Sequence, residues 1–216
     1  MITAAKICGI TTPEALEAAI AGGADYIGLV FFAKSPRHLE IDKAKELARQ
    51  ARGRVKIVAL TVDADDETLR EIVDEVSPDV LQLHGHEAPT RVAAIKKKFG
   101  RAVFKAIPVA TQDDADKACD YADAADLILF DAKAPQGAAL PGGNGRTFDW
   151  NVLDGVSEKL SFMLSGGLQP ENVAEAIAST HPLAVDVSSG VESAPGVKDP
   201  ERIRRFLLAV KTAKQT

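Results

Sequence analysis

A chain of 216 residues is the size of one compact domain, and its 46% hydrophobic but only 5% aromatic content favours parallel strands under Ala-rich helices over an aromatic-cored β-sandwich. A formal net charge of −5, with no Lys/Arg block longer than "KKK" at 96–98, argues against a nucleic-acid or anionic-membrane partner. Neither a signal-peptide pattern nor an apolar run of about 18 residues is found, so we expect a soluble, cytoplasmic protein.

Along the chain, short runs rich in Leu or β-branched residues alternate with amphipathic stretches rich in Ala, Glu and Lys, which predicts repeated strand–helix units. Strands are expected at 5–8, 26–31, 55–62, 80–84, 102–107, 127–131, 161–165 and 184–188. Helices are expected at 13–22, 42–52, 66–76, 88–98, 113–122, 171–179 and 200–213, with a weaker one at 149–156. Proline at the first turn supports the helix starts near 13, 170 and 200.

The number and spacing of these units predict the fold class. Eight strands in 216 residues average 27 residues per unit, which is close to the smallest repeat that holds a strand, a helix and two turns. An open doubly wound sheet usually has five or six strands, so a closed (β/α)8 TIM barrel is the more natural solution. Because no linker or change of composition divides the chain, residues 1–216 are expected to form one α/β domain.

The two cysteines, Cys8 and Cys119, lie 111 positions apart and fit neither a disulfide framework nor a zinc-site spacing. Both are expected to be reduced thiols. Cys119 stands among good helix formers and is expected to pack as a small buried hydrophobe. Cys8 stands where an apolar run breaks into Gly, Thr and Pro, so it either packs or serves as a thiol at the mouth of a site.

One connection is unusually long. The segment 132–148 follows Asp131 and contains four Gly and two Pro without periodicity, whereas about 2 to 6 residues are usual for such a loop. In a barrel it would lie at the C-terminal face, where lids and catalytic groups are found. It is therefore expected to be a lid, although a tolerated surface insertion is the alternative.

Alternation along each strand turns polar side chains toward the barrel axis near the carboxyl ends of several strands. In essentially every characterised TIM barrel the active site lies at that end. Each position also has a simpler interpretation, such as a hydrogen-bonded structural His84 or an Asp186 that satisfies a loop amide. Their joint placement favours a site. The inward residues are Lys6, Cys8, Gln82, His84, Asp131, Asp186 and Ser188.

Two loops have residues that are typical of a phosphate-binding site. Gly166 and Gly167 follow the seventh strand and allow backbone amides to approach an anion, and a helix N-terminus nearby adds attraction. Ser188 and Ser189 follow the eighth strand and offer hydroxyls and amides from the other side. This placement matches the recurrent phosphate site of barrel enzymes, which predicts a phosphorylated metabolite as ligand. The alternative is two ordinary glycine turns.

Several motifs resemble those of the phosphoribosylanthranilate isomerase family of tryptophan biosynthesis over nearly the whole chain. Together they are highly specific, although "SGGL" or "QLHG" alone is not. The motifs are "KICGIT" at 6–11, "KSPR" at 34–37, "LQLHG" at 81–85, "LFDA" at 129–132, "GGNGRTFDW" at 142–150, "SGGLQPENV" at 165–173 and "VDVSSGVE" at 185–192.

The resemblance implies a (β/α)8 barrel that catalyses, without cofactor or metal, an Amadori rearrangement of N-(5-phosphoribosyl)anthranilate to 1-(2-carboxyphenylamino)-1-deoxyribulose 5-phosphate. By motif, Cys8 is the expected general base, Asp131 the general acid, and Arg37 the partner of the anthranilate carboxylate. The implied phosphate site is Gly166, Gly167, Ser188 and Ser189.

Other residues are expected to support this site. Gln82, His84 and Asp186 are expected to bind the substrate or orient the pocket. Lys6 shares a face with Cys8, and its charge is expected to favour the thiolate, because an ordinary thiol is mostly protonated at neutral pH. The sequence leaves a monomer and a homodimer equally open.

Two positions depart from the family's commonest pattern: Asn144 stands where Thr is usual, and His86 where an acidic residue is usual. Neither is one of the proposed acid and base. The alternatives are another phosphosugar isomerase or epimerase barrel, and a non-catalytic barrel that binds a phosphometabolite. The cysteine on the first strand favours the isomerase, since an epimerase would call for a metal with His and Asp ligands and a histidine-pathway isomerase for two aspartates.

Overall fold

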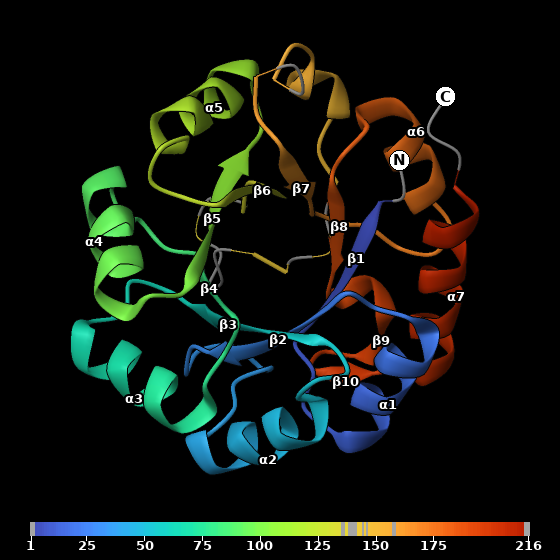
Figure 1. The fold of residues 1–216 in the computed structure, drawn as a ribbon. Helices are drawn as coiled ribbons and strands as arrows, with labels where there is room; N and C mark the ends of the chain where they lie inside the picture. Colours follow the sequence, from blue (N-terminus) through green and yellow to red (C-terminus); the bar gives the residue numbers. More distant parts are fainter. Residues whose placement is uncertain are drawn as a thin grey trace.

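The computed structural model describes residues 3–134, 137, 142, 143, 145, 147–156 and 159–213. Eight parallel strands close into a barrel in chain order, and the helices form a ring around it, which confirms the predicted fold class (Figure 1). The barrel strands are β1 (Ala4–Cys8), β2 (Tyr26–Phe31), β3 (Lys56–Thr61), β4 (Val80–Leu83), β5 (Ala102–Val109), β6 (Leu127–Ala132), β7 (Phe162–Leu164) and β8 (Ala184–Val187).

The helices fill the connections between strands. The α-helices are α1 (Pro13–Gly22), α2 (Ile41–Ala51), α3 (Asp66–Val76), α4 (Pro89–Phe99), α5 (Gln112–Asp116), α6 (Val173–Thr180) and α7 (Pro200–Thr212). Short 3-10 helices are η1 (Lys117–Tyr121), η2 (Trp150–Leu153) and η3 (Ser189–Val191). The last helix, α7, packs beside α1 and so completes the outer ring (Figure 1).

Capping residues explain several helix starts. The side chain of Thr12 accepts from Ala15 N at 3.2 Å, with Pro13 at the first helical position. Asp199 caps α7 in the same way, accepting from the backbone amides of Glu201 and Arg202. These short polar side chains satisfy backbone donors that the first helical turn leaves free.

The predicted helix 113–122 is wrong in form, because it divides into α5 and the 3-10 helix η1. Asp114 folds back to accept from the amide of Ala110, and it pairs with Lys133. Aspartates compete with the helix for backbone hydrogen bonds, which favours a short, irregular element. The packing expected for Cys119 is also wrong: Cys119 is exposed, and its neighbour Ala118 takes the buried position.

Strand register brings ionisable residues together inside the barrel. On the seam where the barrel closes, Lys6 of β1 pairs in register with Asp186 of β8, and on the other side of β1, Cys8 pairs with Gly28 of β2. Partners in parallel register turn their side chains to the same face of the sheet. Lys6 and Asp186 therefore meet inside the barrel, beneath Cys8.

The apolar core has an outer layer between strands and helices and an inner layer along the barrel axis. Leu129 and Met163, both fully buried, lie in the inner layer. A small cluster of Cys8, Val30 and Leu60 lies toward the carboxyl ends of the strands. Apolar packing thus closes the barrel interior, and the polar residues collect above it.

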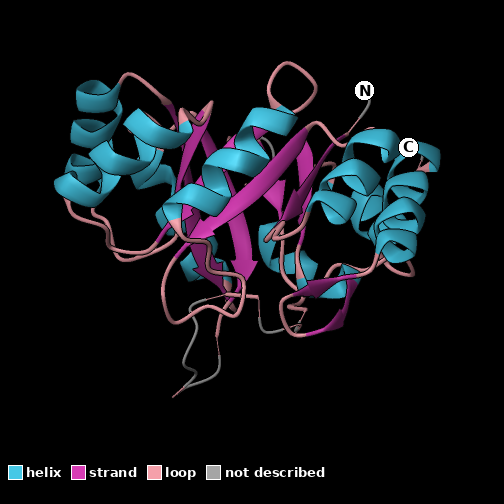
Figure 2. Ribbon diagram, turned by 90° about the horizontal axis from the view of Figure 1, so that it is seen from below, coloured by secondary structure: helices cyan, strands magenta, loops and turns pink. Residues whose placement is uncertain are grey.

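A two-stranded hairpin after β8 adds an element that the sequence patterns do not predict. It consists of β9 (Glu192–Ala194) and β10 (Val197–Lys198), which pair antiparallel. Figure 2 shows it at the end of the barrel toward which the strand arrows point, away from both chain termini. In the part of the chain described here, no helix has the length and apolar character needed to cross a membrane.

Candidate active site

A cavity opens at the carboxyl ends of the strands, as expected for a barrel of this type. Its walls differ in character. One wall is apolar and comes from the ends of β2 and β3, with Val30, Phe32, Leu60 and Val62. The opposite wall consists of the glycine- and serine-rich loops that follow β7 and β8. The cavity therefore suits a ligand that is aromatic at one end and anionic at the other.

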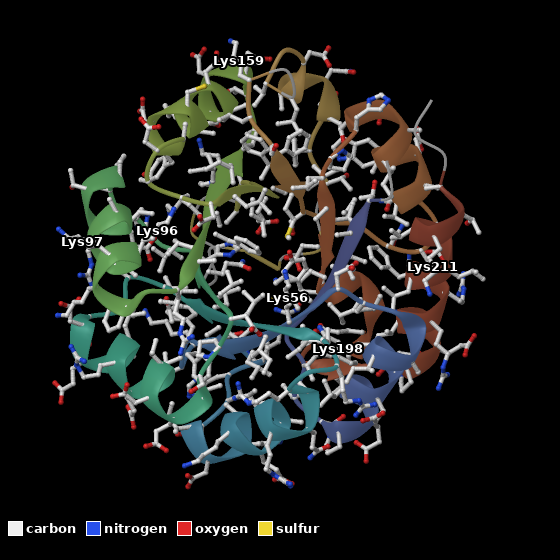
Figure 3. All side chains as sticks on the ribbon, viewed as in Figure 1. Lys56, Lys96, Lys97, Lys159, Lys198 and Lys211 are labelled. Atoms are coloured by element: carbon white, nitrogen blue, oxygen red, sulfur yellow. The ribbon has the colours of Figure 1, made fainter. Side chains whose placement is uncertain are left out.

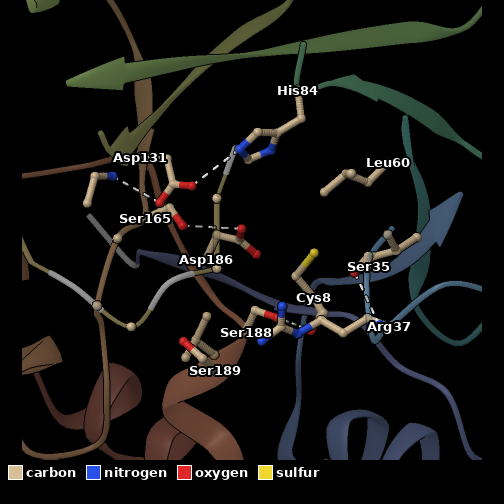
Figure 4. Close-up of a pocket in the computed structure, with 18 of the residues that line it drawn as sticks. Cys8, Ser35, Arg37, Leu60, His84, Asp131, Ser165, Asp186, Ser188 and Ser189 are labelled. Carbon is tan, nitrogen blue, oxygen red and sulfur yellow. Dashed lines mark hydrogen bonds and ion pairs between the residues drawn. The ribbon is translucent and has the colours of Figure 1, made fainter. Parts of the chain in front are cut away.

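Cys8 and Asp131 face this cavity from opposite sides (Figure 4). Cys8 ends β1 and is 4% exposed, whereas Asp131 lies next to the end of β6 and is 5% exposed. The Asp186 carboxylate lies between them in the view of Figure 4. A thiol and a carboxyl that flank one cavity can move protons at two positions of a bound molecule.

Both carboxylate oxygens of Asp131 have a polar neighbour. Its Oδ1 accepts from the backbone amide of Ala132 at 3.0 Å, and its Oδ2 lies 3.2 Å from His84 Nε2. His84 Nδ1 in turn lies 3.1 Å from Nε2 of Gln82. Gln82 is fully buried and does not line the cavity, and it contacts His84, which does.

The contacts that join Gln82, His84 and Asp131 allow two arrangements of protons. When the Gln82 amide donates to His84 Nδ1, the ring proton lies on Nε2 and is donated to an ionised Asp131. When the amide is turned over, Nδ1 donates to Gln82, and Nε2 accepts a proton from a neutral Asp131. Within the described residues, Oε1 of Gln82 has no hydrogen-bond partner, and the second arrangement would use it.

The thiol of Cys8 lies in a strongly charged environment. Burial raises the pKa of Cys8, the charges of Lys6 and Lys198 act to lower it, and Asp186 acts to raise it, with a net increase. Lys6 Nζ donates to Asp186 Oδ1 at 2.8 Å, and both side chains are buried. Burial acts to lower the pKa of Lys6, but Asp186 and Cys8 outweigh it and raise that pKa. Lys6 thus remains a cation beside the thiol, yet it does not by itself make Cys8 a thiolate.

The two loops of the expected phosphate site meet at the cavity. Gly166, Gly167, Ser188 and Ser189 all line it. Gly166 has φ +90°, and a Cβ there would lie 2.6 Å from the backbone nitrogen of Ala132. Ser189 begins the 3-10 helix η3, so a loop and a helix start converge here, as they do in phosphate sites of this fold.

Arg37 lies at the cavity but is not a free cation. It is 6% exposed, and its Nε and Nη2 donate to the two carboxylate oxygens of Glu192 at 2.7 and 2.9 Å. Glu192 also accepts from Lys198 Nζ at 2.5 Å. The sequence patterns did not single out Glu192 or Lys198, because both belong to the hairpin that those patterns missed.

Part of the long loop between β6 and η2 touches the site. A Cβ on Gly142 would lie 2.3 Å from Asp131 Oδ2 and 2.7 Å from His84 Nε2. A Cβ on Gly143 would lie 2.8 Å from Arg37 Nη1. The backbone of this loop thus lies close to both Asp131, the expected general acid, and Arg37, the expected partner of the substrate carboxylate. Asn144 and much of the expected lid fall outside the described residues.

Other sequence expectations are placed as follows. Asp186 and His84 line the cavity, whereas Lys6 lies below it. Ser165, which the sequence patterns did not single out, lines the cavity as well. His86 is on the surface, where its Nδ1 lies 3.1 Å from Asp63 Oδ2. Among the residues that the structure describes, no cluster of three or more His, Cys, Asp or Glu side chains is arranged to hold a metal ion. The four apolar residues of the cavity wall were missed, although strand alternation alone turns Val30 and Leu60 inward.

Sequence comparison identifies relatives over nearly the full chain. The model of the N-(5'phosphoribosyl)anthranilate (PRA) isomerase family matches residues 5–209. The N-(5'-phosphoribosyl)anthranilate isomerase of Rhodopseudomonas palustris (strain BisA53) is 56% identical over 97% of this chain and 96% of its own length. The enzyme of the same name from Bradyrhizobium sp. (strain BTAi1 / ATCC BAA-1182) is 54% identical over 97% of this chain and 96% of its own length.

Solved structures give the same result. The phosphoribosyl anthranilate isomerase of Thermotoga maritima superposes with a TM-score of 0.88 at 35% identity, covering 97% of this chain and 98% of that one. A phosphoribosyl anthranilate isomerase in complex with reduced 1-(o-carboxyphenylamino)-1-deoxyribulose 5-phosphate superposes with a TM-score of 0.85 at 33% identity, with the same coverage.

Proposed function

Because the chain belongs to the N-(5'-phosphoribosyl)anthranilate isomerase family, we propose that Cys8 and Asp131 are the base and the acid with which it performs that family's reaction. The chain is an aldose–ketose isomerase of tryptophan biosynthesis, and its substrate is a phosphorylated small molecule. The observation that carries the residue assignment is the placement of one thiol and one carboxyl on opposite sides of a single cavity.

The character of the cavity walls supports a definite orientation of the substrate. The phosphate is bound by the loops that contain Gly166, Gly167, Ser188 and Ser189. The anthranilate ring packs against the apolar wall, where its carboxylate reaches Arg37. The ribose then lies between these two anchors, with Cys8 on one side and Asp131 on the other. Binding both anchors orients the sugar for proton transfer.

The reaction then begins with two proton transfers, one from the acid and one to the base. Asp131 donates a proton to the furanose ring oxygen, the bond from that oxygen to C1 breaks, and the nitrogen lone pair forms a protonated Schiff base with C1. Cys8 removes the proton from C2, the electrons of that C–H bond form the C1=C2 bond of an enolamine, and the π electrons of the C1=N bond return to nitrogen. Protonation of C1 and loss of the C2 hydroxyl proton give the ketone, so the substrate and the product are isomers.

The raised pKa of Cys8 fits this order of events. The thiol is largely protonated in the free protein, which would make it a poor base toward an ordinary sugar C–H bond. A protonated Schiff base at C1 makes the neighbouring C–H bond more acidic, and its positive charge favours a thiolate nearby. The base is therefore needed only after the acid has acted.

The other residues expected at the site support Cys8 and Asp131. His84, bonded to Gln82, orients Asp131 and exchanges a proton with it. Asp186 binds Lys6 and faces the sugar. These assignments make Gln82 a positioning residue and place His84 and Asp186 at the substrate.

Turnover by Cys8 and Asp131 variants tests the proposal. With purified protein and phosphoribosylanthranilate, the substrate fluorescence should decay faster than it does spontaneously. Cys8→Ala and Asp131→Asn should each lower kcat on the order of 100-fold or more, the usual scale for a general acid or base. Both variants should still bind the reduced product analogue, because the carboxylate and phosphate anchors remain.

The alternatives predict different results. Turnover at the wild-type rate by Cys8→Ala would rule out the base assignment. Binding of the analogue by the unmodified protein without any turnover would favour a non-catalytic barrel. Turnover of another phosphosugar in preference to phosphoribosylanthranilate would favour a different isomerase.

We also infer that the protein acts in the cytoplasm, as a monomer or a homodimer. Both cysteines are free thiols in the structure, which suits a reducing compartment. A relative from Thermotoga maritima is described as dimeric. Sedimentation equilibrium of the purified chain distinguishes the two states, and a larger assembly would contradict both.

A further inference from the structure

Three charged side chains form a buried cluster beside the active site: Arg37, Glu192 and Lys198. They are 6%, 6% and 8% exposed, respectively. Arg37 follows β2, whereas Glu192 and Lys198 belong to the two strands of the β9–β10 hairpin. In Figure 3 Lys96, Lys97 and Lys211 lie at the periphery of the molecule, whereas Lys198 lies inside its outline.

Glu192 fixes the plane and direction of the Arg37 guanidinium. Its two oxygens accept from Nε and Nη2, so one edge of the guanidinium is fully used. Nη1 is not engaged by Glu192 and lies 2.8 Å from the place that a Cβ on Gly143 would take, at the cavity. Arg37 thus presents a fixed donor edge to a ligand.

The cluster has one more cation than it has anions. Burial acts to raise the pKa of Glu192, but hydrogen bonds and charge from Arg37 and Lys198 outweigh it and hold that pKa below its ordinary value. Burial outweighs the charge and hydrogen bond of Glu192 and lowers the pKa of Lys198, so an anion bound nearby would favour the protonated lysine. With Lys198 protonated, two cations surround one carboxylate, which leaves a net charge of +1. A buried excess charge is costly unless it is paired, and a substrate carboxylate would pair it.

Lys198 extends the cluster to the backbone at Cys8. Its Nζ donates to the carbonyl oxygen of Ser188 at 3.0 Å and to Ser188 Oγ at 3.2 Å. The Ser188 hydroxyl donates in turn to the carbonyl oxygen of Cys8 at 3.1 Å. A hydroxyl has a single proton, so this contact uses it. Ser188 therefore links the hairpin to the end of β1.

The hairpin is fixed to the Arg37 loop at its turn. Gly196 has φ +80°, and a Cβ there would lie 2.5 Å from the carbonyl oxygen of Pro36. The Gly196 amide also donates to Glu192 Oε2 at 3.2 Å. The turn thus packs directly against the residue before Arg37, so the hairpin and the arginine form one unit.

We propose that Glu192 and Lys198 are positioning residues of the active site: Glu192 orients Arg37 toward the carboxylate of the substrate, and Lys198 holds Ser188 against the end of β1 and so places its positive charge beside the Cys8 thiol. The first half rests on the proposed function, because it takes Arg37 as the carboxylate ligand. Neither residue contacts the reacting atoms, and both act through residues that line the cavity.

Two ligands test the role of Glu192: the reduced product analogue and the same compound without its ring carboxylate. Glu192→Gln preserves size but gives Arg37 only one acceptor. We expect it to weaken binding of the carboxylate-bearing analogue roughly ten- to hundredfold, and to change affinity for the other less than twofold. Catalysis should show a higher KM with kcat nearly unchanged. Glu201→Gln, which removes a surface partner of Arg204, is the matched control and should change neither affinity.

Equal loss of affinity for both ligands would overturn the proposal, since it would mean that Glu192 only supports the fold. Unchanged affinity for both would overturn it as well. If Glu192→Gln does not fold, Glu192→Asp keeps the charge, shortens its reach and gives the same comparison. Arg37→Ala separates the two inferences: if it does not discriminate between the ligands, the carboxylate assignment in the proposed function is wrong and the role of Glu192 falls with it. If Arg37→Ala discriminates and Glu192→Gln does not, only the positioning by Glu192 is wrong.

Alkylation of Cys8 tests the role of Lys198. The charged groups that act on the thiol are Lys6 on β1, Asp186 on β8, Arg37 after β2 and Lys198 on β10. In a Cys119→Ala background, which removes the exposed thiol, Lys198→Met should move the iodoacetamide rate profile of Cys8 to higher pH. The profile should stay unchanged in Lys211→Met. A profile that Lys198→Met leaves in place would overturn the role of Lys198.

Discussion

At the residue scale, the reactivity of Cys8 depends on a balance between burial and the charges around it. Burial raises the pKa of the thiol, and Asp186 adds to the increase. Lys6 and Lys198 act in the opposite direction from two different strands. A protonated thiol thus lies beside two cations, and these cations would stabilise the Cys8 thiolate in the proposed proton-transfer step.

Replacing Lys6 should disturb this balance in one direction. Lys6→Met removes a charge that lowers the pKa of Cys8 and leaves Asp186 without its cation. The pKa of the thiol then rises further, so activity and alkylation should both begin at a higher pH. The measurement is kcat/KM and the iodoacetamide rate against pH, in the Cys119→Ala background. Lys56→Met at the exposed start of β3 is the control.

The double variant Lys6→Met/Asp186→Asn separates the two causes. It removes both charges, so the pKa of Cys8 in this variant should lie between its values in Lys6→Met and in the unmodified chain. An alkylation profile that does not move in Lys6→Met would contradict the electrostatic role given to this lysine.

At the element scale, the loop between β6 and η2 contacts the site through its backbone. Gly142 lies so close to Asp131 and His84 that no side chain fits between them. Gly142 does not have a positive φ, so alanine fits its backbone but not its surroundings. The glycine is thus required by a close approach to the proposed acid, not by the turn.

Gly142→Ala should therefore impair catalysis without unfolding the barrel. A displacement of the acid by about 1 Å lowers rates by up to about 100-fold, and we expect a loss in kcat of tenfold or more. Stopped-flow fluorescence measures the rate, and circular dichroism checks the fold. Gly137→Ala in the same loop strains a backbone with φ +81° although its Cβ meets nothing within 4 Å, so it is the control for loop strain and should lose little activity. Equal losses in the two variants would show that loop strain, not contact with Asp131, is responsible.

At the scale of the whole molecule, the barrel is held by an inner apolar layer beneath the site. Leu129 lies two residues before Asp131 on β6, on the same face, and is fully buried. Removing its side chain leaves a cavity where the surrounding strands cannot collapse. The catalytic end of the barrel thus rests on packing that has no role in the chemistry.

Leu129→Ala should lower the free energy of unfolding by about 2 to 5 kcal/mol, the range for truncation of a buried Leu. Leu208→Ala on the surface of α7, where the side chain is 63% exposed, should change it by about 0.5 kcal/mol or less. Urea denaturation followed by circular dichroism measures both. A loss below about 1 kcal/mol in Leu129→Ala would contradict the importance of the inner layer.

The barrel was predictable because the strand–helix pattern is repeated eight times. An error in the helix of one unit does not change the number of strands predicted. The helix at 113–122 came out irregular, yet the strands on either side were placed correctly. The hairpin was missed because its strands have only three and two residues, too few for a visible alternation. Pattern methods detect repeated elements and overlook a short, single one.

The same limit applies to the site. Strand parity correctly turned Lys6, Gln82 and Asp186 inward, but it does not say which of them reaches the cavity. Gln82 stops short of it and bonds to His84. The pairing of Arg37 with Glu192 joins residues 155 positions apart, and no local pattern encodes such a contact. Contacts between distant segments therefore needed the three-dimensional structure.

The seam between β1 and β8 has a consequence for how the enzyme comes into being. Lys6 meets Asp186, and the carbonyl of Cys8 meets Ser188, each across 180 positions of the chain. A ribosome that has released only the first seven strands has made the thiol of the proposed base but neither Asp186 nor Ser188. We therefore expect the active site to be complete only after β8 and the hairpin that follows it have docked, so that partly synthesised chains do not turn over the substrate.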